Sequence, residues 1–334
     1  MNQKGIAVAG NLTMDLLYPI HGLPGAGELT SITAEAARST GGCVCNGIID
    51  LAMLDPQLPP TALGRVGEDD AADYVLGRMS PYANVDLSQI RRDGTTSFTL
   101  VLDDILTHQR SFCHWRGANA RFCESDIDWE KLDVSLLHIG YVLLLDALDA
   151  PDEVYGTKLA RLLHTARERG IKTSVDIVTE SGDRYSRIAV PALRYADYCV
   201  INEAEAQATT GVRLVDGEGR LLRDRVPEAL RVMKAMGVGE WAVIHSPEGG
   251  FGLDARDRYV ELDALTLPEG YIRGTVGAGD AFCSGVLYGA WKGLSLGEAL
   301  EMGTAAAACS LSQPGSTEGM RSCAEALALY RSLR

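Results

Sequence analysis

Short apolar segments alternate with longer segments of helical spacing along most of this chain. Each apolar run ends at glycine or at polar residues, which is the pattern of a buried strand. Five strands are predicted in this way, at residues 6–9, 135–139, 173–178, 198–201 and 242–245. Helices are predicted between them, including residues 47–54 and an amphipathic helix over Asp152–Arg169, with Val154 on its apolar face and Gly170 as its stop. This rhythm predicts a mainly parallel sheet with helices on both faces.

One stretch follows a different period. Apolar residues alternate with polar ones at Phe98, Leu100 and Leu102, a polar segment follows at 103–109, and residues 111–115 are again strand-like. The pattern predicts an antiparallel hairpin over residues 95–116, outside the main sheet. Together with the segment near 13–38, this hairpin is interpreted either as a small β-lid over the site or as an ordinary edge hairpin.

Composition narrows the classes of function. The chain has 334 residues, 46% of them hydrophobic, and a net charge of −14. That charge argues against nucleic acid as a partner, and no apolar stretch is long enough to span a membrane. A cytoplasmic location is expected, with the eight cysteines as free thiols. If an anionic nucleotide binds, the attraction must come from helix N-termini, backbone amides and magnesium.

The sharpest motif is Gly274-Thr275-Val276-Gly277-Ala278-Gly279-Asp280, which opens a predicted helix. Small residues let the backbone approach a ligand, and a helix N-terminus favours an anion such as a transferring phosphoryl group. Asp280 is predicted to stay ionised there and to accept a proton from a substrate hydroxyl. The alternative is a tight turn with Asp280 as the helix N-cap.

Three further segments carry polar residues next to predicted element ends. Gly41-Gly42 opens a helix with Asn46 one turn in, and Asp15 follows the first strand. Asn202 and Glu205 are suited to hold magnesium and water against phosphates, although the same pair also fits a capping box. Asp15 is interpreted either as a ligand for vicinal hydroxyls or as a loop acid.

The order of these motifs, with Gly117-Ala118-Asn119 between them, resembles the ribokinase-like (PfkB) carbohydrate and purine kinase family over nearly the whole chain. The resemblance implies one three-layer α/β/α domain over residues 1–334, with a mainly parallel central sheet and a small β-sheet lid formed by inserts near 13–38 and 95–120. ATP and an alcohol would bind in the cleft between them. A homodimer formed through the lid is the one macromolecular partner predicted.

The same resemblance implies a role for each motif residue. Asp280 is the base, and Gly277, Ala278 and Gly279 form the anion hole. Asn202 and Glu205 position magnesium and phosphate. The acceptor would contact Asp15, Gly41, Gly42, Asn46 and Asn119, and ATP would also contact His245, Gly250, Thr275 and Thr304.

Several positions depart from the family pattern. Gly274 stands where an acidic residue commonly helps to hold a monovalent cation, which counts against potassium activation. His245 and Thr304 are unusual residues for the nucleotide side of the site. Nucleotide preference is therefore predicted less sharply than phosphoryl transfer itself.

The predicted function is an ATP-dependent kinase acting on a hydroxyl of a sugar-like metabolite. A nucleoside kinase and a non-catalytic sugar- or nucleoside-binding protein remain as alternatives. A dinucleotide-dependent oxidoreductase is disfavoured because Gly10-Asn11-Leu12-Thr13 lacks the expected glycine fingerprint. A nucleoside would need an aromatic sandwich, and Phe98, Phe112 and Trp115 in the hairpin are either that sandwich or hairpin and dimer packing; a sugar is favoured.

Overall fold

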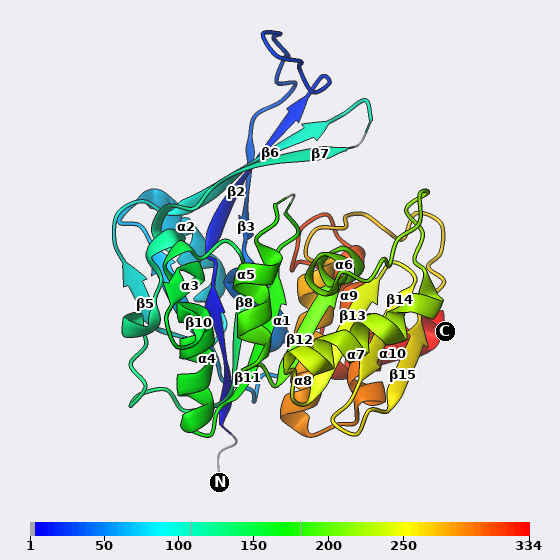
Figure 1. Ribbon diagram of the computed structural model, residues 1–334. Coiled ribbons are helices and arrows are strands. Elements are labelled where there is room, and N and C mark those ends of the chain that lie inside the picture. Colours follow the sequence, from blue (N-terminus) through cyan, green and yellow to red (C-terminus); the bar gives the residue numbers. More distant parts are fainter. Residues whose placement is uncertain (1–3, 108, 181) are drawn as a thin grey trace.

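A nine-stranded sheet forms the centre of the molecule (Figure 1). The computed structural model describes residues 4–107, 109–180 and 182–334. The strand order is β15-β14-β13-β12-β11-β8-β1-β4-β5, and all neighbours are parallel except the two pairs made by β14. The strands are β1 (Gly5–Gly10), β4 (Pro60–Val66), β5 (Asp86–Arg92), β8 (Val134–Val142), β11 (Lys172–Ile177), β12 (Tyr198–Asn202), β13 (Trp241–Ser246), β14 (Gly249–Leu253) and β15 (Tyr259–Asp263).

Two helical layers cover the two faces of this sheet, each with its own hydrophobic cluster. One layer holds α4 (Lys158–Glu168), α5 (Tyr185–Leu193), α6 (Glu203–Thr210) and α7 (Val226–Met236). The other holds α1 (Cys43–Leu54), α2 (Asp70–Met79), α8 (Ala278–Lys292), α9 (Leu296–Leu311) and α10 (Cys323–Leu333). This arrangement confirms the predicted three-layer α/β/α fold with a mainly parallel sheet, and the five predicted strands lie in β1, β8, β11, β12 and β13.

The helix predicted over residues 152–169 is wrong in its first turn and a half. Residues 151–157 instead form a tight hairpin of β9 (Pro151–Asp152) and β10 (Gly156–Thr157). The helix begins at Lys158 because the Thr157 side chain accepts a hydrogen bond from the Ala160 N–H at 3.1 Å. Val154, counted on the apolar face, is 79% exposed at the hairpin tip.

Shorter elements link the layers. They are the helix α3 (Asp146–Asp149) and three 3₁₀ turns, η1 (Gly117–Arg121), η2 (Glu124–Asp126) and η3 (Arg223–Arg225). The helix predicted over residues 47–54 starts earlier, because Gly42 at φ 86° turns the chain directly into α1 at Cys43. All eight cysteines are free thiols. Within the described ranges, no helix is both long and apolar enough to cross a membrane.

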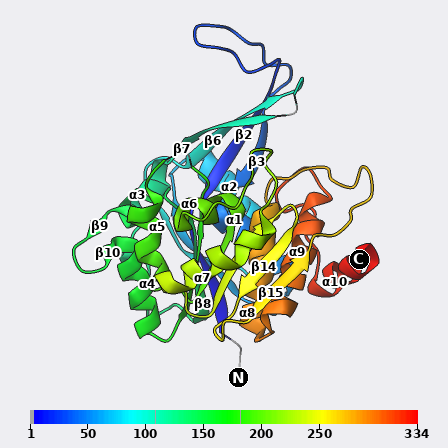
Figure 2. The same cartoon turned by 45° about the vertical axis from the view of Figure 1, so that its right-hand side comes forward.

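A second, smaller sheet stands over the end of the main sheet where the parallel strands finish (Figures 1 and 2). Its order is β3-β2-β6-β7, with β2 (Thr13–Ile20), β3 (Ala37–Gly41), β6 (Ser97–Asp104) and β7 (Arg110–Trp115). β6 and β7 pair antiparallel, as predicted for residues 95–116, although residue 108 in the turn lies outside the described residues. The strands at residues 13–20 and 37–41 and those at 97–104 and 110–115, far apart in the sequence, thus build one sheet.

The position of α8 depends on close packing against α9. A Cβ added at Gly285 of α8 would lie 2.6 Å from the Met302 carbonyl oxygen of α9, so only glycine lets the two helices approach so closely. The packing sets where the first turn of α8 lies above the sheet.

We therefore expect Gly285→Ala to lower the free energy of unfolding by about 1–3 kcal/mol, because the added methyl group overpacks the contact. Gly77→Ala is the matched control, since a Cβ on that exposed residue of α2 would meet nothing within 4 Å. The control should be about 0.5–1 kcal/mol more stable than the wild type, from helix propensity alone. Urea unfolding of both variants measures the difference, and equal effects would contradict this account of the packing.

Candidate functional site

Asp280 lies in the first turn of α8, and its side chain does not cap the helix. The N-cap is Gly277 at φ 82°, with no side-chain cap hydrogen bond, and Asp280 is the third helical residue. A Cβ at Gly277 would lie 2.5 Å from the Ser316 carbonyl oxygen, so this turn needs glycine both for its φ and for space. The alternative in which Asp280 serves as the N-cap is wrong.

Two donors from distant elements bind one oxygen of the Asp280 carboxylate. Asn46 Nδ2 of α1 donates to Oδ2 at 2.8 Å, and the Tyr141 hydroxyl at the end of β8 donates to the same atom at 2.9 Å. Asn46 Oδ1 in turn accepts from Ser316 Oγ at 2.9 Å, which fixes the orientation of the amide. No donor among the described residues contacts Asp280 Oδ1. The free oxygen is therefore the one placed to accept a proton.

The surroundings of Asp280 affect the pKa of its carboxyl group and place backbone N–H groups beside it. Burial raises the pKa of this carboxyl above its usual range, while the bonds from Asn46 and Tyr141 act in the opposite direction. The N–H groups of Gly279 and Asp280, at the start of α8, have no hydrogen-bond partner among the described residues. A helix start of this kind places two donors and a partial positive charge beside the carboxylate.

Asp280 borders a pocket of about 270 Å³ at the carboxyl ends of β8, β11 and β12. We call it the acidic pocket, because its lining includes three carboxyl groups and no lysine or arginine. Of the predicted residues, Asn202, Glu205, His245, Gly277, Gly279 and Asp280 line this pocket. The fold therefore brings six of the predicted site residues together in one cavity.

Two lining residues of the acidic pocket, Asp176 and Cys283, also belong to a buried polar group that the motifs did not indicate. Asp176 of β11 has 4.0 Å between its Oδ2 and Nε2 of His138, and Cys283 Sγ lies 4.0 Å from the same nitrogen. Burial lowers the pKa of His138 to about 4, so its ring is neutral at pH 7, and burial also raises the pKa of Asp176 well above its usual range. The Asp176 carboxyl also accepts from the Tyr141 backbone N–H.

Asn202 and Glu205 form the capping box that the sequence allowed. Asn202 Oδ1 accepts from the Glu205 N–H at 2.9 Å, and Glu205 Oε2 accepts from the Asn202 N–H at 3.0 Å. Thr179 donates its hydroxyl to Glu205 Oε1 at 2.8 Å. Burial raises the pKa of Glu205 to about 7 in spite of these bonds. The pair thus caps α6 and also lines the acidic pocket.

Of the four further residues predicted for the nucleotide side, one lines the acidic pocket, His245. His245 is neutral, because burial lowers its pKa to about 4, and its ring packs against Phe282 with 5.0 Å between ring centroids. Gly250 pairs with His245 in the β13–β14 ladder. Thr275 is exposed just before α8, and Thr304 is half-buried on α9. None of these last three lines the acidic pocket.

Asp15 lies on β2 facing Asp280. Burial raises its pKa to about 6, the Thr99 hydroxyl acts against that shift, and the Asp280 charge adds to it. A Cβ at Gly41 would collide with the Asp15 carboxylate, so the first glycine of the pair leaves room for this acid. The second, Gly42, starts α1 and thereby directs Asn46 to Asp280.

Asn119 does not have the geometry of a substrate ligand. It is fully buried, and its amide bonds both backbone groups of Leu12, with Oδ1 accepting at 3.2 Å and Nδ2 donating at 3.1 Å. The prediction that Asn119 contacts the acceptor is therefore at odds with the structure. Its side chain instead fixes the chain between β1 and β2.

Sequence reasoning missed Tyr141, Thr99, Asp176 and Ser316. Tyr141 carried one usable signal, since it follows a predicted buried strand at the edge where ligands bind in parallel sheets. In the structure it has φ 57°, a left-handed conformation that is unusual for a residue other than glycine and clusters at functional sites. The other three residues lie in segments without a motif. The fold brings Thr99 to Asp15, Asp176 to Asp280 and Ser316 to Asn46.

The comparisons with known proteins agree with this fold. A model of the pfkB family carbohydrate kinases matches residues 3–323. A Halopiger xanaduensis ATP-dependent ribose-1-phosphate kinase is 28% identical over 291 residues, which are 84% of this chain and 82% of that protein. Among solved structures, an Arabidopsis thaliana ribokinase complexed with ribose and ATP has a TM-score of 0.80 at 19% identity, covering 98% of this chain and 99% of the other. A Thermotoga maritima ribokinase has a TM-score of 0.79 at 20% identity with the same coverage.

The raised pKa of Asp15 predicts how stability depends on pH. Its folded pKa is about 6, against roughly 3.9 in an unfolded chain, so above pH 6 folding bears the cost of a buried charge. We expect Asp15→Asn to melt about 1–3 °C higher than the wild type at pH 8. The gain should shrink as the pH falls from 6 towards 4, because the folded wild type then binds a proton. Calorimetry at a series of pH values measures this, and Asp183→Asn, at a carboxylate 92% exposed, serves as the control.

Proposed function

Because the chain belongs to the pfkB family of carbohydrate kinases, we propose that it is an ATP-dependent kinase that phosphorylates a hydroxyl of a sugar-like metabolite, with Asp280 as the catalytic base. The observation that carries this proposal is the Asp280 carboxylate, buried beside a helix start, with Oδ2 held by two donors and Oδ1 free. The base has a fixed orientation before any substrate binds.

In the proposed reaction, Asp280 Oδ1 takes the proton of the acceptor hydroxyl as that oxygen attacks the γ-phosphorus of ATP. The new bond joins the acceptor oxygen to phosphorus, and the bond from phosphorus to the β–γ bridging oxygen breaks, so that its electrons leave with ADP. The start of α8, formed by Gly277, Ala278 and Gly279, offers backbone N–H groups to the moving phosphoryl group. Positioning and charge stabilisation supply most of the rate enhancement.

The acidic pocket suits a magnesium-bound triphosphate. Its lining has no cationic side chain to offset the charge of a bare polyphosphate, whereas a metal–phosphate complex would bring its own positive charge to the carboxyl groups there. Asn202 and Glu205 would hold magnesium, most directly through water, since their own atoms already bond one another. When bound, the ion supplies positive charge to the phosphate oxygens. His245, Gly250, Thr275 and Thr304 are proposed for the ATP side.

The small sheet is proposed as the lid over the acceptor. Asp15 would accept hydrogen bonds from the acceptor's hydroxyls, with Gly41 and Gly42 lining the same site, and Asn46 would join them beside Asp280. β2 and β3 place Asp15 and Gly41 next to one another on the sheet that stands over the strand ends. The strands that form the proposed lid thus also carry two of the proposed acceptor contacts, Asp15 and Gly41.

Potassium activation is not part of the proposal. Gly274 has no carboxylate to offer, and a Cβ there would lie 2.6 Å from the Pro314 carbonyl oxygen, so the loop leaves no room for an acidic side chain. We expect turnover to be independent of potassium.

A sugar is favoured over a nucleoside by the placement of the aromatic residues. Phe98 and Trp115 pack on one another with 5.4 Å between ring centroids. Each is the sequence neighbour of Thr99 or His114, which are in register with Asp15 on the neighbouring strands. Because successive side chains of a strand alternate between faces, the two rings lie on the opposite face of the small sheet from Asp15. Of these three aromatic residues of the hairpin, only Phe112 shares the face of Asp15, and it is 61% exposed. One ring does not make a sandwich for a nucleobase.

The relatives support this acceptor class. The Halopiger protein is named a ribose-1-phosphate kinase, and the Arabidopsis structure contains ribose and ATP. The intact Asp280 site favours a kinase over a non-catalytic binding protein. Exposed apolar side chains at the far end of the small sheet, Leu29, Ile32, Leu106 and Phe112, are compatible with the predicted homodimer.

We expect Asp280→Asn to lower kcat by about 10²–10⁴-fold, because the amide cannot accept the proton while the shape of the site is kept. Release of ADP in the presence of a sugar panel measures turnover, and thermal shift with an ATP analogue checks that nucleotide binding survives. The exposed Asp183→Asn variant should retain wild-type turnover. Near-normal turnover of Asp280→Asn would remove Asp280 from the role of base.

Tyr141→Phe tests how the base is tuned. The hydroxyl donates to the ionised carboxylate, so its loss should raise the pKa of Asp280 and move the acidic limb of the kcat/KM profile to higher pH. Tyr74→Phe removes a hydroxyl that donates to the Arg38 carbonyl at 2.8 Å, away from Asp280, and should leave the profile unchanged. An unshifted limb in Tyr141→Phe would show that this bond does not tune the base.

A further inference from the structure

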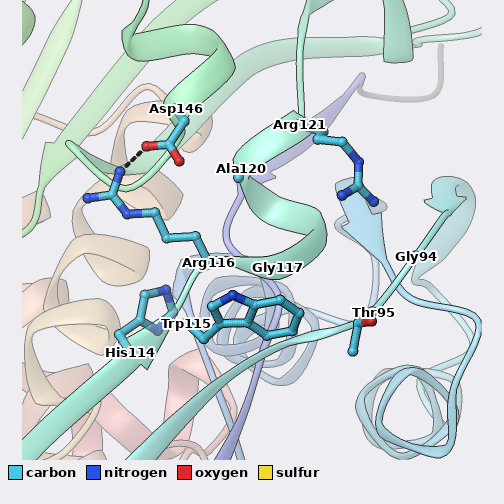
Figure 3. A pocket seen from close by; sticks show the side chains of 9 residues that line it. All are labelled: Gly94, Thr95, His114, Trp115, Arg116, Gly117, Ala120, Arg121 and Asp146. Carbon is cyan, nitrogen blue, oxygen red and sulfur yellow. Dashed lines mark hydrogen bonds and ion pairs between the residues drawn. The ribbon is translucent and has the colours of Figure 1, made fainter.

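A second cavity, of about 490 Å³, opens at the base of the small sheet (Figure 3). We call it the basic pocket. It lies where β7 ends, between η1 and the start of α3, and its lining residues are Gly94, Thr95, His114, Trp115, Arg116, Gly117, Ala120, Arg121 and Asp146. None of the predicted site residues lines it.

The charge of the basic pocket is opposite to that of the acidic pocket. Its lining carries two arginines against one aspartate in a chain whose net charge is −14, while Asp93, next to the lining residue Gly94, pairs with Arg121. The acidic pocket carries three carboxyl groups and no arginine or lysine. An anionic group of a ligand is therefore favoured at the base of the small sheet and needs a metal ion beside Asp280.

Arg116 is the side chain best placed for such a group. It extends from the end of β7 across the pocket, and Nη1 bonds the Asp146 carboxylate of α3 (Figure 3). Its Nε and Nη2 have no partner among the described residues, and its side chain is 29% exposed. Arg121 is more fully engaged, since it donates from Nε and Nη2 to Asp93. A guanidinium held on one side offers its remaining N–H groups to an oxyanion in a fixed orientation.

A row of hydrogen bonds across the small sheet connects this pocket with Asp15. Asp15, Thr99 and His114 are register partners on β2, β6 and β7. The Thr99 hydroxyl bonds the Asp15 carboxylate, and Thr99 Oγ1 lies 3.1 Å from His114 Nδ1. The row is two strand spacings wide, about 10 Å. A sugar whose hydroxyls lie at Asp15 therefore reaches the basic pocket with a substituent at its other end.

His114 has one ring nitrogen left for a ligand. A Thr99 hydroxyl that donates to Asp15 accepts from His114 Nδ1–H, which leaves Nε2 as an acceptor. Nε2 is buried and has no partner among the described residues. Burial, together with the nearby Arg116, lowers the pKa of His114, so the ring is neutral at pH 7. A neutral Nε2 can accept a hydrogen bond from a sugar hydroxyl, and the anionic group of the ligand would bind Arg116 instead.

We propose that the acceptor is an anionic sugar, a sugar phosphate or sugar acid, whose charged group is bound by Arg116 in the basic pocket while His114 accepts a hydrogen bond from one of its hydroxyls. This inference rests on the proposed function and narrows its substrate. The hydroxyl to be phosphorylated then lies at Asp280, at the opposite end of the molecule from the existing charge.

The test compares three matched pairs of ligands, ribose with ribose 1-phosphate, fructose with fructose 1-phosphate, and glucose with gluconate. Binding is measured by calorimetry and turnover by ADP release. In at least one pair the wild type should bind the anionic member at least tenfold more tightly. Arg116→Gln should weaken that binding about 10- to 100-fold, the usual cost of a lost bond to a charged group, and should leave the neutral members unchanged. Arg116→Lys should restore part of the loss. The phosphate and carboxylate pairs tell which anion fits.

Arg110→Gln is the matched control, because Arg110 lies on the same strand in an ion pair with Asp103 at 3.5 Å, away from the pocket. It should bind every ligand as the wild type does. The inference would be overturned if the wild type bound the charged and neutral members of every pair equally. It would also be overturned if Arg116→Gln weakened the binding of both members equally, or if no anionic member bound through Arg116. Arg116-dependent binding without ADP release would instead overturn the proposed function and leave the inference standing.

Discussion

The arrangement of the site depends on how a buried carboxylate obtains its hydrogen-bond donors. Asp280 Oδ2 receives one bond from α1 and one from the end of β8, although Asn46 and Tyr141 are 234 and 139 residues away in the chain. Both bonds require α8 to start at one place, and the contact of α8 with α9 determines that place. Three elements of the α/β/α core are thereby fixed around one oxygen atom, and the other oxygen is left for chemistry.

The same bonds separate Asp280 from the other acids around it. Asp50 and Asp176 are buried and Asp280 is partly buried at the edge of the acidic pocket, and desolvation raises the pKa of each. The pKa values of Asp50 and Asp176 are raised well above the usual range, and the charge of Asp280 raises them further. Only Asp280 has two side-chain donors on one oxygen. The bonds from Asn46 and Tyr141 thus oppose the effect of burial at Asp280 alone among these three acids, which favours the ionised state that the proposed general base needs.

Local signals in the sequence predicted the layers, the separate hairpin and six residues of the acidic pocket, because strand periodicity and glycine-rich helix starts are set by neighbouring residues. The first part of the helix at 152–169 was wrong because the Thr157 cap, rather than the apolar period, decided where α4 begins. Ser316 had no local signature and Tyr141 had only its place after a predicted strand, since the contacts of both come from distant parts of the fold. Asn119 belonged to a true motif, but its amide is used on the Leu12 backbone, which only the structure shows.

The two pockets also suggest why this site has opposite charges at its two ends. Phosphoryl transfer brings a polyphosphate close to Asp280, and a second anion at that place would add repulsion to an already acidic lining. Under the proposed function, a charged group on the acceptor is better placed beyond the row from Asp15 to His114, which is about 10 Å wide, where Arg116 would compensate for it. The small sheet carries Asp15, and Arg116 directly follows its last strand, β7. This row of strands would therefore set which end of the proposed anionic sugar faces Asp280.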